Sequence, residues 1–131
     1  MIQPGGTFLD KSRESVTGAR AEYEAGCYNN AANRSCYAVF QAANHALQLE
    51  GVRLPGGGDA WGHGFVDSQF SRLLINRRHR YESSLRNIIE ENRKLREDTD
   101  YATGGLNPIR ASRSVQPAER FVAAVILRDA E

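Results

Sequence analysis

A chain of 131 residues is long enough to bury one sizeable hydrophobic core but too short for two, so we expect a single domain over residues 1–131. Seventeen Lys and Arg residues against sixteen Asp and Glu residues leave a formal charge of +1. This balance argues against a general polyanion binder but allows a local basic patch. No apolar run has the length of a signal peptide or of a membrane span, so we expect a cytoplasmic protein without membrane association.

Helical periodicity governs the first half of the chain. Thr7 is a candidate cap for a first helix that starts at Phe8, and Gly26 marks its end. A second helix follows directly and ends at Gly51. Its apolar face consists of residues three and four positions apart, namely Tyr28, Ala32, Cys36, Val39, Phe40, Ala43 and Leu47.

Three polar residues of the second helix, Asn29, Asn33 and Arg34, fall outside this apolar face. They suit a polar groove or a seam between subunits. Two interpretations of Arg34 remain open, because an arginine on the flank of a helix can bind phosphate or pair with a carboxylate such as Asp98 or Asp100.

A glycine-rich segment, "GVRLPGGGDAWGHG", occupies residues 51–64 and predicts a loop. It lacks the fixed glycine and lysine spacing of a phosphate-binding loop, and no strand precedes it. The functional role of residues 55–64 stays open. His63 is expected to anchor the loop, and no cysteine or carboxylate stands at metal-ligand spacing from it, so we expect no metal and no cofactor.

The second half of the chain is also helical. A short helix over residues 65–74 is interrupted by the polar "NRRHR", and a longer helix then carries Leu85, Ile88, Ile89, Asn92 and Leu95. "YATGGLNP" breaks that helix, and a last helix follows with Pro117 in its first turn. No segment alternates with period two, so we expect an all-α antiparallel bundle of four main helices, the third of them split.

Residues 26–43 and 96–101 carry a resemblance to a known family. The first stretch reads G-x-Y-x-x-A-x-x-R-x-x-Y-A-x-F-x-A-A, a glycine-rich loop and "HGFVDSQF" follow it, and "REDTDY" supplies an R-x-x-x-D-Y element. Together these features resemble the HEPN family, named for higher eukaryotes and prokaryotes nucleotide-binding. The resemblance spans about residues 8–128.

The resemblance implies a HEPN-like helical bundle that forms a homodimer. It further implies binding of RNA, a nucleotide or a protein partner through Arg34, Tyr37, His63, Arg96, Asp100 and Tyr101. Tyr37 also has a plain structural interpretation, because aromatic residues at helical spacing commonly belong to the core. Asp100 and Tyr101 could likewise cap the break after the long helix.

Catalytic HEPN branches resemble metal-independent ribonucleases that use an arginine and, after four to six intervening residues, a histidine. The histidine would move the proton of the ribose 2′-hydroxyl while the arginine stabilises charge on the phosphate. Here Tyr101 follows Arg96 at that position. Tyrosine, with an ordinary pKa near about 10, is a poor base at neutral pH.

A second arginine and histidine pair at family-like spacing is Arg72 and His79, with Tyr81 completing an H-x-Y arrangement. This pair precedes the long helix, whereas the family element follows it. The pair is therefore a weak candidate for a catalytic site, and a solvated turn between helices is the preferred interpretation of these residues.

Two functional hypotheses follow. The first is a dimeric binding or regulatory module without catalytic histidine, acting in a toxin-antitoxin or defence-type system with a nucleotidyltransferase-like partner. The alternative is an RNA-cleaving toxin, a metal-independent endoribonuclease that uses His79 or an altered site at Arg96 and Tyr101. The absent histidine favours the first hypothesis.

Overall fold

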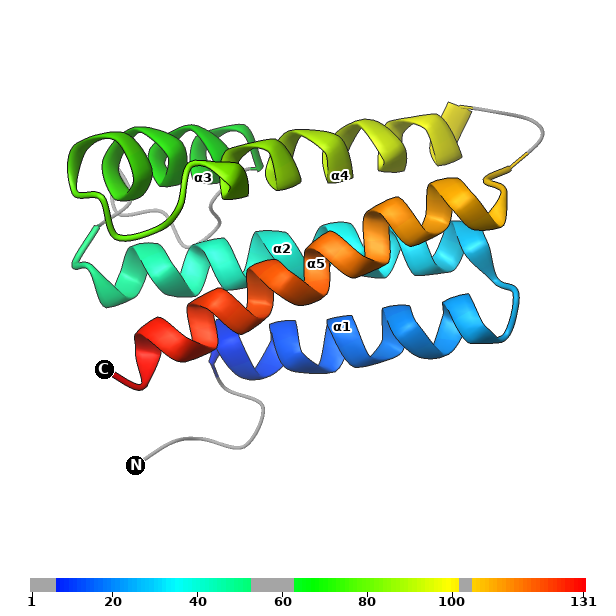
Figure 1. The fold of residues 1–131 in the computed structure, drawn as a ribbon, viewed down its shortest axis with the longest axis horizontal. Helices are drawn as coiled ribbons and strands as arrows, with labels where there is room; N and C mark the ends of the chain where they lie inside the picture. The colour runs from blue at the N-terminus through cyan, green and yellow to red at the C-terminus, as the bar shows by residue number, and fades with distance from the viewer. Residues whose placement is uncertain (1–6, 53–62, 102–104) are drawn as a thin grey trace.

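The structure, a computed structural model, describes residues 7–52, 63–101 and 105–131, and every regular element in this part of the chain is a helix (Figure 1). The α-helices and one π-helix, η2, are α1 Phe8–Glu24, α2 Tyr28–Leu49, α3 His63–Gln69, η2 Phe70–Arg77, α4 Ser84–Tyr101 and α5 Pro108–Asp129. The prediction of an all-α fold is confirmed for the described residues.

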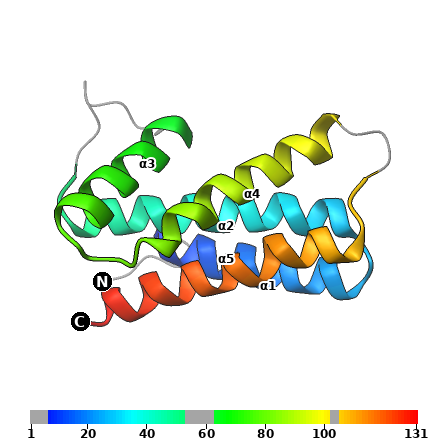
Figure 2. The same cartoon turned by 45° about the horizontal axis from the view of Figure 1, so that its top comes forward.

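Consecutive long helices run in opposite directions (Figure 1). Helix α2 is antiparallel to α1, and α5 is antiparallel to α4. Helix α3 continues directly into η2, and residues 78–83 then separate η2 from α4. An interruption near the predicted "NRRHR" is thus present. Figure 2 shows that α3 and α4 diverge from this turn, so they form two helices that point in different directions rather than one broken rod.

The ends of α1 follow from local sequence. Thr7 Oγ1 accepts a hydrogen bond of 3.0 Å from the backbone N–H of Asp10, as expected of an N-cap. At the other end Gly26 has a φ of 83°, a conformation that favours glycine, and the N–H of Cys27 donates to the carbonyl of Glu22 at 2.8 Å. Both predicted boundaries of this helix are confirmed.

Helix α2 lies at the centre of the bundle and packs against α1, α3, η2, α4 and α5. Its apolar surface is therefore wider than the single predicted stripe. Small side chains allow neighbouring helices to approach α2 closely from several sides. Six alanines of α2 have no solvent exposure, namely Ala31, Ala32, Ala38, Ala42, Ala43 and Ala46. The central position explains why this segment is so rich in alanine.

A buried polar pair links α4 to α5 inside the bundle. Ser114 Oγ donates to Asn92 Oδ1 at 2.7 Å, and the Asn92 amide lies 3.4 Å from the carbonyl oxygens of Ile88 and Ser114. Asn92 is 1% exposed and Ser114 is fully buried. Asn92 falls on the predicted apolar face of α4, and its burial is stable because its polar atoms have partners.

The start of the last helix differs from the prediction. Helix α5 begins at Pro108, where Asn107 Oδ1 accepts a hydrogen bond of 2.8 Å from the N–H of Arg110. Pro117 therefore lies inside α5 and not in its first turn. It removes one helical hydrogen bond, to the carbonyl of Arg113, and Arg113 is exposed, so water can replace the missing donor.

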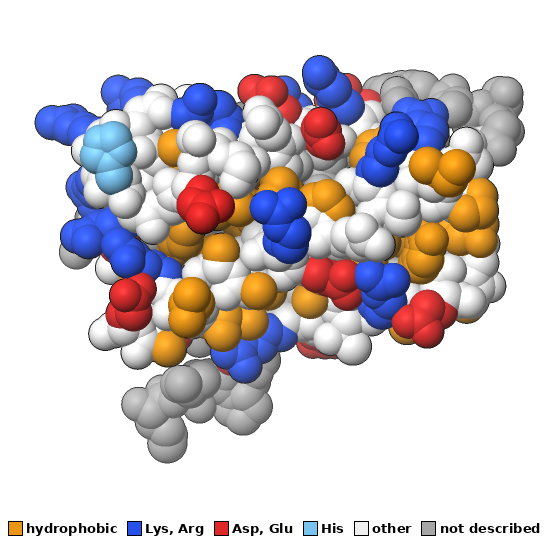
Figure 3. Space-filling view, viewed as in Figure 1, with side chains coloured by type: hydrophobic (Ala, Val, Ile, Leu, Met, Phe, Trp, Pro, Cys, Tyr) orange, Lys and Arg blue, Asp and Glu red, His pale blue; other side chains and the backbone are white. Residues whose placement is uncertain are grey.

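The surface of the described part of the chain is mixed. Figure 3 shows apolar side chains interspersed with charges of both signs over the face that α5 and α1 form. None of the described helices is both long enough and apolar enough to cross a membrane. Helices α1, α4 and α5 instead bury one face in the core and keep charged residues on the other.

Candidate functional site

The N-terminal half of α2 presents a polar face outside the core. Asn30, Asn33, Arg34 and Tyr37 recur at spacings of three and four residues, so they share one side of the helix. Asn30 and Arg34 are exposed, and Tyr37 is 44% exposed although it is aromatic. The structural interpretation that placed Tyr37 in the core is therefore wrong.

Arg96 of α4 joins this face across 63 residues of sequence. Its Nε donates a hydrogen bond of 3.3 Å to Asn33 Oδ1, and its guanidinium carbon lies 5.4 Å from the centre of the Tyr37 ring. These distances fit a hydrogen bond and a cation–π contact. The five residues Asn30, Asn33, Arg34, Tyr37 and Arg96 line a cavity of about 420 Å³.

Arg34 is held from the side of α1. Its Nε lies 3.9 Å from Glu22 Oε1, and its side chain is about half exposed. A Cβ atom on Gly18 would lie only 3.1 Å from Arg34 Cδ, so the absence of a side chain at Gly18 leaves room for the arginine stem across α1. The pair with Glu22 is long and exposed, and such pairs contribute little stability. The arginine remains able to bind an anion.

Three predicted site residues cannot be placed with the others. His63 begins α3, and Asp100 and Tyr101 end α4, but their side chains lie outside the described part of the structure. The glycine-rich residues 55–62 also lie outside it. Arg34, Tyr37 and Arg96 are thus the predicted site residues that the described structure brings together.

The weaker catalytic pair has a different setting. The Arg72 guanidinium donates to Gln69 Oε1 at 3.2 Å, and Arg72 lines a cavity between η2 and α4 that His79 does not line. His79 is exposed in the turn after η2, with a φ of 52°. No described contact joins the two residues, which leaves their spacing in the sequence as the sole link between them.

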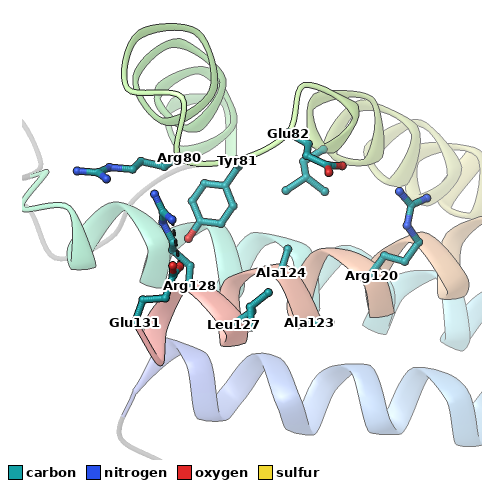
Figure 4. Close-up of a pocket in the computed structure, with 10 residues that line it drawn as sticks. Arg80, Tyr81, Glu82, Arg120, Ala123, Ala124, Leu127, Arg128 and Glu131 are labelled. Atoms are coloured by element: carbon teal, nitrogen blue, oxygen red, sulfur yellow. Dashed lines mark hydrogen bonds and ion pairs between the residues drawn. The ribbon is translucent and has the colours of Figure 1, made fainter.

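Tyr81 follows His79 and lies in the wall of a separate groove between α5 and the turn before α4 (Figure 4). Its hydroxyl oxygen is buried and has no hydrogen-bond partner within the described structure. Burial raises the pKa of Tyr81 to about 12, a shift that the nearby Arg128 partly opposes. The hydroxyl therefore stays protonated at neutral pH and is unsuited to act as a base.

His45 lies apart from the candidate site. It occupies the C-terminal half of α2, where its Nε2 is 2.7 Å from Asp129 Oδ1 of α5. Its side chain is 16% exposed. His45 thus links two helices of the bundle. The polar face with Arg34, which Arg96 of α4 joins, belongs to the other half of α2.

Asn29, which the sequence grouped with Asn33 and Arg34, has a structural role. Its Oδ1 accepts a hydrogen bond of 2.9 Å from the backbone N–H of Leu106, just before α5. Gly105, at a φ of 71°, passes so close that a Cβ there would lie 3.2 Å from the Asn29 amide. Asn30 takes its place in the cavity, and helical spacing from Asn33 and Tyr37 was the available signal for it.

The chemistry of the cavity is that of binding. Two guanidinium groups can hold a phosphate or carboxylate, two amides can donate or accept hydrogen bonds, and an exposed aromatic ring can stack on a planar group. None of the described residues that line the cavity is a histidine. The described side chains therefore provide anion contacts and no imidazole base.

No family model matches the chain, and no curated protein sequence matches it.

Proposed function

We propose that this chain is a HEPN-type binding module that takes a phosphate-bearing ligand, RNA or a nucleotide, at the face between α2 and α4. The observation that carries the proposal is the position of Arg96, bonded to Asn33 and lying against the exposed ring of Tyr37. Arg34, the residue after Asn33, also lines the cavity and adds a second guanidinium.

Each of these groups has a counterpart in a nucleotide. Guanidinium groups bind phosphate oxygens in pairs, and aromatic rings stack on unpaired bases. Asparagine amides can bond to base edges or to ribose hydroxyls. A nearly neutral chain with two arginines at this face suits a short single-stranded segment or a mononucleotide better than a long duplex.

The resemblance supports two further parts of the proposal, a homodimer and a nucleotidyltransferase-like partner in a toxin-antitoxin or defence-type system. A dimer would bring two copies of the α2 and α4 face into one assembly. Light scattering that finds only monomer at tens of micromolar, roughly the concentration at which a moderate dimer forms, would contradict that part. Failure of this chain and a nucleotidyltransferase-like protein to copurify would contradict the proposed partnership.

Replacing Arg96 by alanine is expected to weaken binding of a fluorescent single-stranded RNA oligonucleotide about tenfold. It should also reduce the dependence of binding on salt by about one phosphate contact. Anisotropy titrations at two or more salt concentrations measure both effects. Lys94→Ala, an exposed cation on the same helix, is the matched control and should have a small effect.

Two replacements at Tyr37 extend this experiment. Tyr37→Phe keeps the ring and should retain binding, whereas Tyr37→Ala should lose the stacking surface. Equal binding by the parent and by Arg96→Ala would refute the site.

If the parent instead cleaves RNA in the presence of a chelator, and His79→Ala abolishes the cleavage, the endoribonuclease alternative replaces the binding module.

A further inference from the structure

A second polar cavity, of about 310 Å³, lies between the segment of α3 and η2 and the facing side of α4. It shares no residue with the face formed by Asn33 and Arg96. Serines and arginines dominate its lining, since Ser68 and Ser71 come from one side and Arg86 and Arg93 from the other. Its volume is at the lower end of the range for small-molecule sites, about 300–1,000 Å³.

Three arginines line this cavity, and the hydrogen bonds described for two of them go to neutral partners. Arg72 donates to Gln69, and Arg86 donates to Asn76 Oδ1. Within the part of the chain that the structure describes, neither arginine has a carboxylate within 4.0 Å. A guanidinium has five N–H donors, so both groups retain donors after these single bonds.

The cavity also contains two carboxylates, which set its charge. Asp67 lies 3.7 Å from Arg93 and its side chain is 15% exposed, so it neutralises that arginine. Glu90 is exposed at the margin. With both carboxylates ionised, three cations and two anions leave a formal charge of +1, and neither carboxylate lies within 4.0 Å of Arg72 or Arg86.

We propose that the cavity binds a phosphate group, free or as a small monoester, between Arg72 and Arg86, with hydroxyl contacts from Ser68 and Ser71. Arginines from two different helices line it, and serine hydroxyls are common donors to phosphate oxygens. Remaining volume beside the phosphate accommodates a small organic group. Because Arg72 comes from η2 and Arg86 from α4, the bound anion would bridge the two helices that diverge from the turn at residues 78–83 (Figure 2).

Isothermal titration of the full chain with inorganic phosphate, glycerol 3-phosphate and glycerol tests the proposal. The two phosphate compounds should bind and glycerol should not. A higher affinity for glycerol 3-phosphate than for inorganic phosphate would identify a small phosphorylated molecule as the preferred ligand. The double variant Arg72→Gln/Arg86→Gln should weaken phosphate binding at least about tenfold, as loss of charge-assisted bonds predicts.

Three matched variants distinguish this cavity from other cationic surfaces. Glu90→Gln removes the opposing charge and should tighten binding, whereas Arg113→Gln, at an exposed position of α5, should leave it unchanged. The double variant is also measured in an Arg96→Ala background, where the face proposed for RNA is weakened, so that a loss caused by Arg72→Gln/Arg86→Gln there belongs to this cavity. Phosphate binding that the double variant leaves unchanged in the Arg96→Ala background would overturn the proposal. Circular dichroism melts confirm that each variant is folded.

Discussion

Replacing Asn92 by alanine is expected to lower the free energy of unfolding by about 2–4 kcal/mol. The change removes the acceptor of the 2.7 Å hydrogen bond from Ser114 Oγ in a site where both side chains are almost fully buried. Water cannot easily replace the lost partner, so the Ser114 hydroxyl would pay its desolvation cost in full. Urea denaturation monitored by circular dichroism measures the effect.

The partner and a surface control sharpen this experiment. Ser114→Ala should cost less, about 1–2 kcal/mol, and the double variant should cost less than the sum of the two single changes because they share one interaction. Asn87→Ala, an exposed asparagine of the same helix, should change stability by no more than about 0.5 kcal/mol. Equal costs at positions 87 and 92 would contradict a special contribution of the buried pair, because alanine is the better helix former at both positions.

Replacing Asp67 by asparagine is expected to stabilise the protein at neutral pH. Burial raises the pKa of the Asp67 carboxyl from 3.8 to about 6, with Arg93 opposing the shift and Glu90 adding to it. The folded chain therefore holds a proton that the unfolded chain has lost between about pH 4 and pH 6, and the parent loses stability as the pH rises through that window. The full cost is about 3 kcal/mol by the pKa difference.

The variant cannot ionise at this position, so its advantage should be greatest above about pH 6 and should fade towards pH 4. The pKa of about 6 already includes the opposing effect of Arg93, which is itself 45% exposed, so loss of that ion pair needs no separate deduction. Urea denaturation of both proteins from pH 4 to pH 8 measures the difference. Glu91→Gln, an exposed carboxyl on α4, is the control and should follow the parent. A difference that does not vary with pH would assign the effect to packing.

Local sequence determined the helices and several of their ends. Thr7 as a cap and Gly26 as a terminator act through backbone groups within four residues of themselves, so no distant contact is needed to predict them. The common side of Asn30, Asn33 and Tyr37 is likewise a property of helical spacing. Asn33 and Arg34 were predicted on this basis, whereas Asn29 was predicted there in place of Asn30.

The start of α5 shows where local signals compete. Asn107 and Pro108 form a strong start signal, and Pro117 forms another one nine residues later. The prediction placed Pro117 in the first turn, but the buried residues of the first half of α5, Ala111, Ser114 and Val115, pack within the bundle and hold the helix together through the proline. Tertiary packing outweighed the cost of one missing hydrogen bond.

The sequence by itself determined the helical segments, apart from the first half of α5, and which residues share a helix face, because those properties depend on neighbours three or four positions away. The tertiary structure alone decided that α2 is surrounded on several sides, that Arg96 meets Asn33 and Tyr37, and that Asn92 finds Ser114. These contacts join residues on separate helices, and the relative placement of helices depends on how all of their side chains pack together. No local pattern specifies that placement.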